Sequence, residues 1–390
     1  MAFRPSVLVV GALAAIMLPQ ARAEKYDMVK EYAGSTFFND WAFYDHFDNL
    51  TNGDVVFVGA QQAAQNKLAF VDPSTNHAII KIDNTTTVPF NEKRNAVRIQ
   101  TNEMYSVGSL WTIDMYHVPY GCSVWPAFWS HSPNWPDGGE IDVFEGVNLQ
   151  QRNQMALHTN PGCKQVNPNQ SVDSSFIPNT DCSYLTNNNQ GCIVNDPDVQ
   201  SYGAEFASAG GGVWVTEYAE SGISIWFMPR AKVASVISSN SSTIDTSELG
   251  TPTANWPTGG CDMNTFFAPQ NIILDITLCG DFAKPPQIFS QTCPGLCYED
   301  WVVGNGSSYA TAYFEIGSMR VFSKSGTTTT VGGQNNSDSS SGSSDSSGSS
   351  GPSDSSAATL NVDWVRMMMY VVSLWGIGLG SSFVVENFAF

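Results

Sequence analysis

The chain has 390 residues and a formal charge of −19 at pH 7; 14% of its residues are charged and 12% are aromatic. The acidic balance argues against a nucleic-acid binder, whose affinity comes largely from neutralising phosphates, and the aromatic content argues against bulk disorder. A mean hydropathy of −0.14 argues against a polytopic membrane protein, while few charges with many aromatic, Gly, Asn and Thr residues are typical of a secreted, strand-rich protein.

The N-terminal segment has the pattern of a secretory signal peptide. Arg4 supplies the basic region, residues 6–18 are mostly apolar, and residues 21–23 (Ala-Arg-Ala) form a small-x-small cleavage site. The apolar run is shorter than the roughly 20 residues that a membrane span requires. We therefore expect residues 1–23 to be a signal peptide and Glu24 to begin the mature chain; a membrane anchor or a buried helix is the alternative.

Residues 24–324 have the pattern of one folded domain. Short alternating or β-branched runs, separated by Gly, Pro and Asn clusters, predict many short strands and therefore an all-β sandwich or barrel. The expected strands are 55–58, 78–82, 96–100, 109–115, 139–144, 222–228, 271–278 and 312–322. The segment 231–237 is the one expected helix, and the Gly run 210–212 predicts a turn into a strand.

The cysteines and glycosylation sequons are typical of the secretory route. All eight cysteines lie in the folded segment, which predicts up to four disulfides among 105 pairings that the sequence does not distinguish. Zinc is disfavoured because the close pair, Cys293 and Cys297, has no neighbouring histidine. The six sequons begin at Asn49, Asn84, Asn169, Asn240, Asn305 and Asn335.

The C-terminal part predicts a stalk and an anchor. Residues 325–358 are rich in Ser, Asp and Gly, a composition that buries no core. The tail 359–390 has a polar spacer after small residues and then an uncharged, mostly apolar run over 367–385, which is the pattern of a glycosylphosphatidylinositol (GPI) signal. A single transmembrane helix is the alternative. With either anchor, the expected location is extracellular or at the cell surface.

Three carboxylates, Glu140, Asp142 and Glu145, lie within six residues of an otherwise apolar strand. Alternation places Glu140 and Asp142 on one face, and a β-bulge around residues 143–144 would return Glu145 to it. Crowded carboxylates separate their pKa values, so that one stays ionised while another holds a proton. Retaining glycoside cleavage requires such a pair, with the carboxyl groups about 5–5.5 Å apart.

Two other interpretations fit the carboxylates alone. A solvated strand face is common on antiparallel sheets, and carboxylate oxygens bind Ca²⁺. Trp125, Trp129 and Trp135 precede the cluster, and His158 follows it. Aromatic rings stack on the apolar faces of sugars, so these neighbours favour catalysis on a carbohydrate. The other histidines have no partner spacing and are expected at the surface or in the core: His46, His77, His117 and His131.

The run Glu-Ile-Asp-Val-Phe-Glu over residues 140–145 resembles the Glu-x-Asp-x-x-Glu signature of glycoside hydrolase family 16. The surrounding sequence is similar to the fungal endo-1,3(4)-β-glucanase, or laminarinase-like, branch of that family, and the resemblance covers the whole folded segment. The stretches that carry it are 32–38, 125–129 (Trp-Pro-Ala-Phe-Trp), 146–148 (Gly-Val-Asn), 157–159 (Leu-His-Thr), 279–283 and 314–322.

The resemblance implies a β-jelly-roll sandwich, a concanavalin A-like fold, with an open substrate cleft across its concave face. It implies that Glu140 is the nucleophile, that Glu145 is the general acid/base and that Asp142 is an electrostatic helper between them. The residues that it implies for substrate binding are Trp129, Trp135, His158 and Trp256.

The expected function is therefore a secreted, surface-tethered endo-β-glucanase that hydrolyses β-1,3 and mixed β-1,3/1,4-glucans with retention. The expected partner is the β-glucan polysaccharide; we expect a monomer, no cofactor, no metal, no nucleic acid, and a membrane contact only through the C-terminal anchor. The alternatives are a cell-wall transglycosylase with the same residues and a non-catalytic glucan-binding module. The extra residue before Glu145 favours hydrolysis, because family members that remodel cell walls by transfer often have the shorter Glu-x-Asp-x-Glu pattern.

Overall fold

The computed structural model describes residues 24–171, 175–176, 179–237, 241–327 and 329–332. They belong to the first of two compact units of the chain, residues 1–335. The predicted signal peptide, most of the predicted stalk and the predicted tail lie outside the described residues. Within the described ranges, no helix combines the length and the apolar character that crossing a membrane requires.

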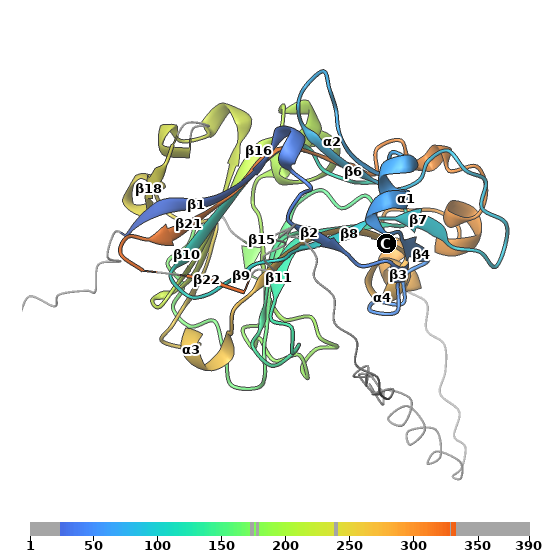
Figure 1. The fold of residues 1–390 in the computed structure, drawn as a ribbon. Coiled ribbons are helices and arrows are strands. Elements are labelled where there is room, and N and C mark those ends of the chain that lie inside the picture. Colours follow the sequence, from blue (N-terminus) through green and yellow to red (C-terminus); the bar gives the residue numbers. More distant parts are fainter. Residues whose placement is uncertain (1–23, 172–174, 177–178, 238–240, 328, 333–390) are drawn as a thin grey trace, which may run out of the picture. The chain divides into compact units, whose positions relative to one another are not determined.

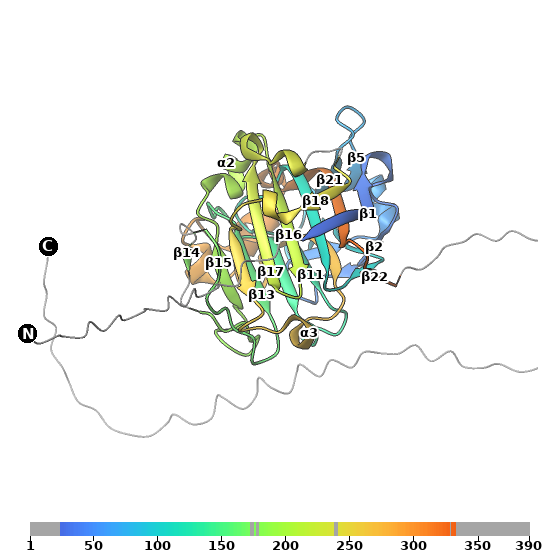
Figure 2. The same cartoon turned by 90° about the vertical axis from the view of Figure 1, so that its left-hand side faces the viewer.

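Two large antiparallel sheets lie face to face (Figures 1 and 2). The nine-stranded sheet pairs its strands in the order β18 (Thr243–Asp245), β1 (Lys25–Ala33), β21 (Tyr313–Lys324), β10 (Ser109–His117), β16 (Gly212–Ala219), β17 (Gly222–Pro229) and β19 (Ala254–Pro257), with β6 (Ala78–Lys81) beside β21 and β5 (Ala69–Val71) beside β6. The eight-stranded sheet has the order β14 (Ser175–Phe176), β15 (Cys192–Asn195), β13 (Gln154–His158), β12 (Glu140–Glu145), β11 (Val124–His131), β20 (Asn271–Leu278), β8 (Arg98–Thr101) and β2 (Trp41–Phe43). This arrangement confirms the predicted all-β jelly-roll sandwich.

Two small sheets complete the strands of the described part. One contains β3 (His46–Phe47), β4 (Val55–Phe57) and β7 (Arg94–Ala96). The other pairs β9 (Met104–Tyr105) with β22 (Thr330–Val331). Because β22 pairs with β9, strand pairing continues past residue 324, the predicted end of the folded domain.

Helices are short, and the sequence pattern missed most of them. They are α1 (Ala60–Gln65), α2 (Gly203–Ser208), α3 (Met263–Phe266), α4 (Gly280–Ala283), α5 (Pro286–Phe289) and a π-helical turn at Cys297–Val302, with 3₁₀ turns at Gly34–Thr36, Val199–Ser201, Arg230–Lys232, Ser235–Ile237, Thr246–Glu248 and Ser307–Tyr309. The predicted helix over 231–237 is wrong, because that segment forms two separate 3₁₀ turns. Helices of four to six residues are too short to show a helical period.

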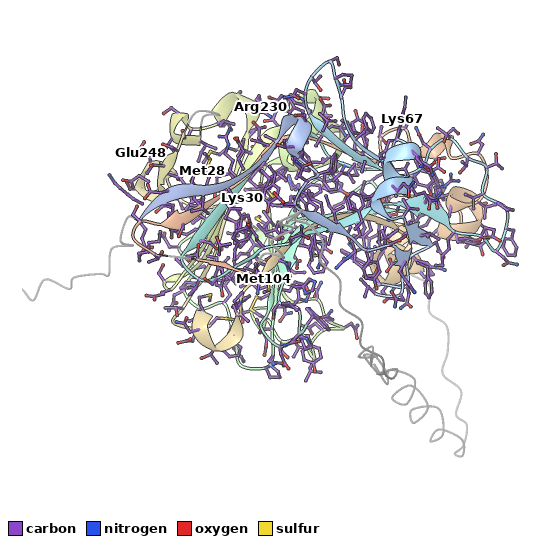
Figure 3. All side chains as sticks on the ribbon, viewed as in Figure 1. Met28, Lys30, Lys67, Met104, Arg230 and Glu248 are labelled. Atoms are coloured by element: carbon purple, nitrogen blue, oxygen red, sulfur yellow. A yellow bond between two sulfur atoms is a disulfide. The ribbon has the colours of Figure 1, made fainter. Side chains whose placement is uncertain are left out.

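The main core lies between the two sheets, where side chains fill the space (Figure 3). Phe144 of the eight-stranded sheet packs against Trp214 and Phe314 of the nine-stranded sheet, with ring centroids 5.3 and 6.0 Å apart. Each buried aromatic ring removes roughly 150–250 Å² from water. A second apolar cluster lies on the opposite face of the nine-stranded sheet. It contains Ile244 of β18 together with Ile237 and Leu249.

The domain contains four disulfides, so the expectation from the cysteine count is confirmed. The pairs are Cys122–Cys293, Cys163–Cys261, Cys182–Cys192 and Cys279–Cys297. Cys293 and Cys297, the close pair in the sequence, bond to different partners. Both thiols that a zinc site would need are therefore consumed.

Arg94 links the long connections at one end of the sandwich through hydrogen bonds. Its side chain is fully buried and donates to four backbone carbonyls at 2.6–3.1 Å, those of Asp83, Thr86, Val302 and Gly304. The guanidinium fork is suited to this task because it presents several donors in one rigid plane. It therefore joins the start of β7 to a segment two hundred residues later in the chain.

We expect Arg94→Met to lower the free energy of unfolding by at least about 3 kcal/mol, because buried carbonyls that lose their donors each cost about 1–3 kcal/mol. Urea unfolding of the variant and the parent measures the difference. The matched control is Lys25→Met, whose ammonium is exposed and 3.8 Å from Asp245. This control should change stability by less than about 0.5 kcal/mol, and equal effects of the two substitutions would contradict the role assigned to Arg94.

Candidate active site

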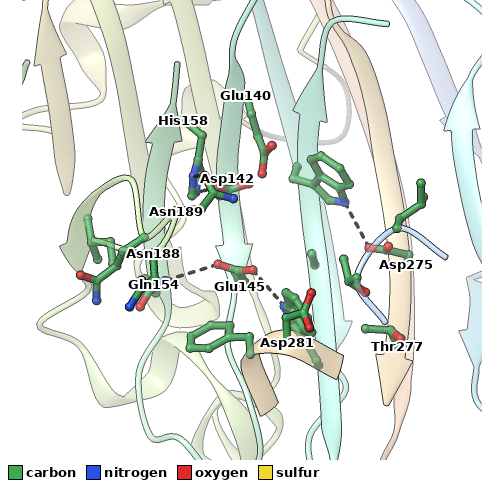
Figure 4. Close-up of a pocket in the computed structure, with 18 of the residues that line it drawn as sticks. Glu140, Asp142, Glu145, Gln154, His158, Asn188, Asn189, Asp275, Thr277 and Asp281 are labelled. Carbon is green, nitrogen blue, oxygen red and sulfur yellow. Dashed lines mark hydrogen bonds and ion pairs between the residues drawn. The ribbon is translucent and has the colours of Figure 1, made fainter. Parts of the chain in front are cut away.

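A cleft of about 780 Å³ crosses the face of the eight-stranded sheet that points away from the core (Figure 4). Its floor is formed by side chains of β11, β12, β13, β20 and β8. Its walls come from residues 50–51, 187–190 and 281–288. The floor follows from the alternation of β11, whose residues 125, 127, 129 and 131 line the cleft while residues 124, 126, 128 and 130 are buried.

The predicted β-bulge is present in β12. Phe144 pairs with Phe128, whereas Asp142 pairs with the next residue of β11, Trp129, so Val143 has no partner in that strand. Val143 and Phe144 are both fully buried in the core. The extra residue therefore returns Glu145 to the face of Glu140 and Asp142, and all three carboxylates line the cleft.

Each of the three carboxylates has its own partner. The indole Nε1–H of Trp135 donates to Glu140, and the indole Nε1–H of Trp125 donates to Glu145 at 2.9 Å. Gln154 on β13 also donates to Glu145, at 3.3 Å. The middle carboxylate forms an ion pair instead, in which Nε2 of His158 lies 3.1 Å from Oδ2 of Asp142.

Burial shifts the titration of the carboxylates upward. Burial and then the adjacent charge of Asp142 raise the pKa of Glu140 to about 8. Burial also raises the pKa of Asp142 and that of Glu145. These groups titrate as one coupled cluster. The cluster therefore retains a proton at a pH where an isolated glutamate, with a pKa of about 4.3, has lost it.

His158 supplies the positive charge of this cluster. Burial disfavours its charged form, but the charge of Glu140 and the contact with Asp142 outweigh burial and raise its pKa to about 10. Its second ring nitrogen, Nδ1, lies 3.1 Å from the side-chain oxygen of Asn189. Both nitrogens thus face oxygen acceptors, which is the environment that a doubly protonated imidazolium requires.

Three residues of this cluster lie close enough to bind one metal ion, which bears on the calcium alternative of the sequence analysis. Glu140, Asp142 and His158 offer ligand atoms that all lie within 4.8 Å of one another. Calcium takes about 6–8 oxygen ligands, whereas one of the three ligand atoms here is an imidazole nitrogen. These residues therefore suit a charge cluster better than a calcium site.

Trp129 is held in place by residues that the sequence analysis did not select. Its Nε1–H donates to Asp275 at 3.1 Å, and Asp275 also forms a 2.8 Å ion pair with Arg98. The Arg98 guanidinium lies 4.8 Å from the Trp129 ring centroid, and His131 stacks on the same ring at 5.1 Å. A signal existed, because Asp275 is the one charged residue within the apolar strand 271–278.

The structure brings together most of the predicted site residues but not all of them. Trp129, Trp135 and His158 line the cleft with the three carboxylates. Trp256 does not: it lies on β19 in the nine-stranded sheet, fully buried in the main core. Its predicted place in the cleft is wrong, because local sequence does not distinguish a core tryptophan from one in a cleft.

The histidine expectations are mostly confirmed. His46 is exposed, His77 forms a 2.8 Å ion pair with Glu315, and His117 is buried. His131 is the exception, because it lines the cleft. The alternation of β11 places His131 on the same face as Trp129, two residues earlier, which is a pattern that the sequence analysis did not use.

We expect Trp125→Phe to raise the pKa of Glu145, because loss of the indole N–H removes a donor that stabilises the ionised carboxylate. Carbon-13 NMR titration of the glutamate carboxyl carbons measures the shift. Trp256→Phe is the matched control: its Nε1 has no hydrogen-bond partner and the residue lies in the other sheet. If Trp125→Phe leaves the Glu145 pKa unchanged or lowers it, the assigned hydrogen bond is wrong.

Comparisons with known proteins agree with this geometry. A model of the XgeA-like, catalytic GH16 domain matches residues 41–322. A probable glycosidase of Schizosaccharomyces pombe is 35% identical over 306 residues, which cover 78% of this chain and 71% of that protein. A probable endo-1,3(4)-β-glucanase of Neosartorya fischeri is 35% identical over 327 residues, which cover 81% of this chain and 48% of that protein. The chain thus spans about half the length of the latter relative.

Two solved structures are also similar. Laminarinase 16A of Phanerochaete chrysosporium, a GH16 enzyme with the β-glucan 6-O-glucosyl-laminaritriose in donor and acceptor sites, is 36% identical with a TM-score of 0.72. The match covers 76% of this chain and 99% of that one. An elongating GH family 16 β-1,3-glucosyltransferase is 32% identical with a TM-score of 0.70, covering 76% of this chain and all of the other (100%).

Proposed function

Because the chain belongs to glycoside hydrolase family 16, we propose that it is an endo-β-glucanase that cleaves β-1,3 and mixed β-1,3/1,4-glucans with retention of configuration. One observation carries the proposal: a bulged strand presents three separately partnered carboxylates to an open cleft. A cleft that is open along a sheet suits an internal segment of a polymer. The names of the similar fungal proteins support this substrate class.

In the first step, the carboxylate of Glu140 attacks the anomeric carbon while Glu145 donates its proton to the leaving oxygen. The glycosidic C–O bond breaks and a covalent glycosyl–enzyme forms. The Trp135 N–H, which donates to Glu140, stabilises its ionised form before attack. In the second step, Glu145 takes a proton from water, the water oxygen bonds to the anomeric carbon, and Glu140 leaves.

Asp142 and His158 act as a charge pair beside the nucleophile. The ionised Asp142 disfavours a second negative charge on Glu140, whereas the imidazolium of His158 favours it. When Glu140 becomes an ester, its charge disappears and the Asp142–His158 ion pair remains. Trp129 and Trp135 lie toward the Glu140 end of the cleft and supply ring faces for sugar units.

We expect Glu140→Ala and Glu145→Ala each to lose at least about 10³-fold in kcat on laminarin, because each removes a group that takes part directly in bond making or proton transfer. Added azide distinguishes their roles. With Glu140→Ala, azide attacks in place of the nucleophile and yields an α-glycosyl azide. With Glu145→Ala, azide attacks the glycosyl–enzyme and yields a β-glycosyl azide.

The parent protein should release reducing ends from laminarin and lichenan but not from cellulose. Asp137→Asn is the control: it removes an acidic side chain outside the carboxylate cluster and should keep the activity of the parent. NMR of the anomeric protons identifies both azide products. Interchanged azide anomers would reverse the two assignments. An inactive but glucan-binding parent would favour a non-catalytic module.

The second candidate is glucan transfer, which the similarity to the elongating glucosyltransferase supports. The wall at the Glu145 end of the cleft has three apolar side chains, Phe282, Pro285 and Ile288, besides the polar Asp281 and Gln287. The apolar part of this wall would favour a second sugar over water as the acceptor. Oligosaccharide mixtures that lengthen without new reducing ends would identify transfer as the main activity.

We expect kcat/KM to follow a bell-shaped pH profile whose alkaline limb lies well above the ordinary glutamate pKa of about 4.3. The active form holds one proton on the Glu140–Glu145 pair, and burial raises both pKa values. Activity should therefore be present at mildly acidic pH and fall as pH rises through the upper pKa of the pair.

Asp142→Asn tests the sign of this prediction. The negative charge of Asp142 raises the pKa of Glu140. Removal of this charge should therefore move the acid limb of the pH profile to lower pH. Asp27→Asn, on β1 of the other sheet, is the control and should leave the profile unchanged. An acid limb that moves to higher pH in Asp142→Asn would show that the charge of Asp142 does not act on Glu140 in this way.

The proposal includes secretion and tethering of the folded domain by the C-terminal segment, which rest on the sequence patterns of residues 1–23 and 325–390. If the anchor is GPI, treatment of intact cells with phosphatidylinositol-specific phospholipase C should release the glucanase into the medium. A chain that ends at residue 358 is the control, because it should be in the medium without treatment. Retention after phospholipase treatment, with release by detergent, would favour a transmembrane helix.

A further inference from the structure

The loop between Cys182 and Cys192 is fastened at both ends to β13, the strand that ends at His158. Cys192 pairs with Leu157 in the sheet, and the amide of Thr159 donates to the carbonyl of Cys182 at 2.8 Å. The disulfide joins the two ends of the loop. The loop is therefore held over the residue that forms the ion pair with Asp142.

This loop contains an uncommon backbone conformation. Asn187, Asn188 and Asn189 all have positive φ, at 49°, 56° and 59°. The left-handed conformation is unfavourable for a residue with a Cβ, less so for Asn, and such residues normally occur singly. Three in succession form a strained turn that the surrounding structure holds in place beside the cleft.

The turn brings one side chain and one backbone segment against His158 (Figure 4). The side-chain oxygen of Asn189 lies 3.1 Å from Nδ1 of His158. Gly191, at φ 68°, packs so closely that a Cβ there would lie 2.9 Å from the imidazole ring and 2.6 Å from the Leu157 carbonyl oxygen. The ring thus faces Asp142 through Nε2 and Asn189 through Nδ1, and Gly191 packs beside Cε1 and Nε2.

The same loop touches the partner of Glu140. The ring of Tyr184 meets the ring of Trp135 edge to face, with centroids 5.7 Å apart. Trp135 donates to Glu140 and His158 pairs with Asp142. The loop closed by this disulfide therefore contacts the partners of two of the three carboxylates, the hydrogen-bond donor of Glu140 and the ion-pair partner of Asp142.

We propose that Asn189 is a positioning residue, which accepts a hydrogen bond from Nδ1–H of His158 and thereby directs Nε2–H at Asp142. The left-handed turn of residues 187–189 presents its side-chain oxygen for this purpose. The charged groups that face His158 are Glu140, Asp142 and Glu145, all from β12. The proposal rests on the proposed glycosidase function, because it concerns the reactivity of those carboxylates.

The test compares substitutions that keep the left-handed turn. Asn189→Gly adopts positive φ without strain and removes the acceptor, whereas Asn189→Asp retains an acceptor oxygen. With Asn189→Gly, we expect kcat on laminarin to fall about 5- to 20-fold with KM changed less than twofold, because the imidazolium loses one of the two acceptors that orient it. Asn189→Asp should recover kcat to within about threefold of the parent.

A readout independent of activity is the pKa of His158, measured by NMR titration of the full-length oxidised protein and assigned with His158→Gln. The pKa should fall by about 0.5–1 unit in Asn189→Gly and should not fall in Asn189→Asp. The matched control is Asn188→Gly, which shares the left-handed conformation and should leave the His158 pKa unchanged.

Three results would overturn the proposal: an unchanged His158 pKa in Asn189→Gly, equal shifts in Asn188→Gly and Asn189→Gly, or a loss of kcat in Asn189→Asp as large as in Asn189→Gly. Failure of the proposed function is distinguishable, since a parent without activity on any glucan would still show the His158 shift if Asn189 positions the ring. An active parent with no shift refutes the positioning role alone.

Discussion

The constraint on which the site depends is electrostatic: three carboxylates share one face of a sheet whose other face is a packed core. Transfer of an ionised carboxylate from water costs several kcal/mol unless donors or a counter-charge compensate. The chain meets this requirement one carboxylate at a time, through Trp135, His158 and Trp125. Because each partner comes from a different segment, β11, β13 and the 132–139 connection must all be in place before the cluster is stable.

The bulge at Val143 connects the core to the cleft. It places two successive apolar side chains, Val143 and Phe144, in the core, and it is the extra residue that directs Glu145 outward. Phe144 then packs on Trp214 and Phe314 across the sandwich. The position of the proposed acid/base is therefore set by packing between the two sheets. A substitution that shifts Phe144 would also shift the side chain of Glu145.

The cleft has different surroundings at its two ends. Near Glu140, Trp129 is held by Arg98, Asp275 and His131, a polar arrangement that fixes a ring face for sugar stacking. Near Glu145, the wall is mixed: short helices beside the Cys279–Cys297 and Cys122–Cys293 disulfides present apolar side chains there together with Asp281 and Gln287. In the proposed function, one end orients a sugar, while the other governs which acceptor, water or a second glucan, reaches the intermediate.

The sequence by itself determined the features that depend on local periodicity. Alternation and one extra residue were enough to place Glu140, Asp142 and Glu145 on one face and to predict the bulge, and the even cysteine count was enough to predict disulfides. Tertiary structure alone decided which cysteines pair, that Trp256 is buried in the opposite sheet, and that Arg98, Asp275 and Asn189 reach the cleft. The physical reason is that these outcomes depend on which strands become neighbours: β8 and β20, far apart in sequence, pair beside β11. Side-chain patterns within a strand carry information about its two faces, but not about the strand that will lie next to it.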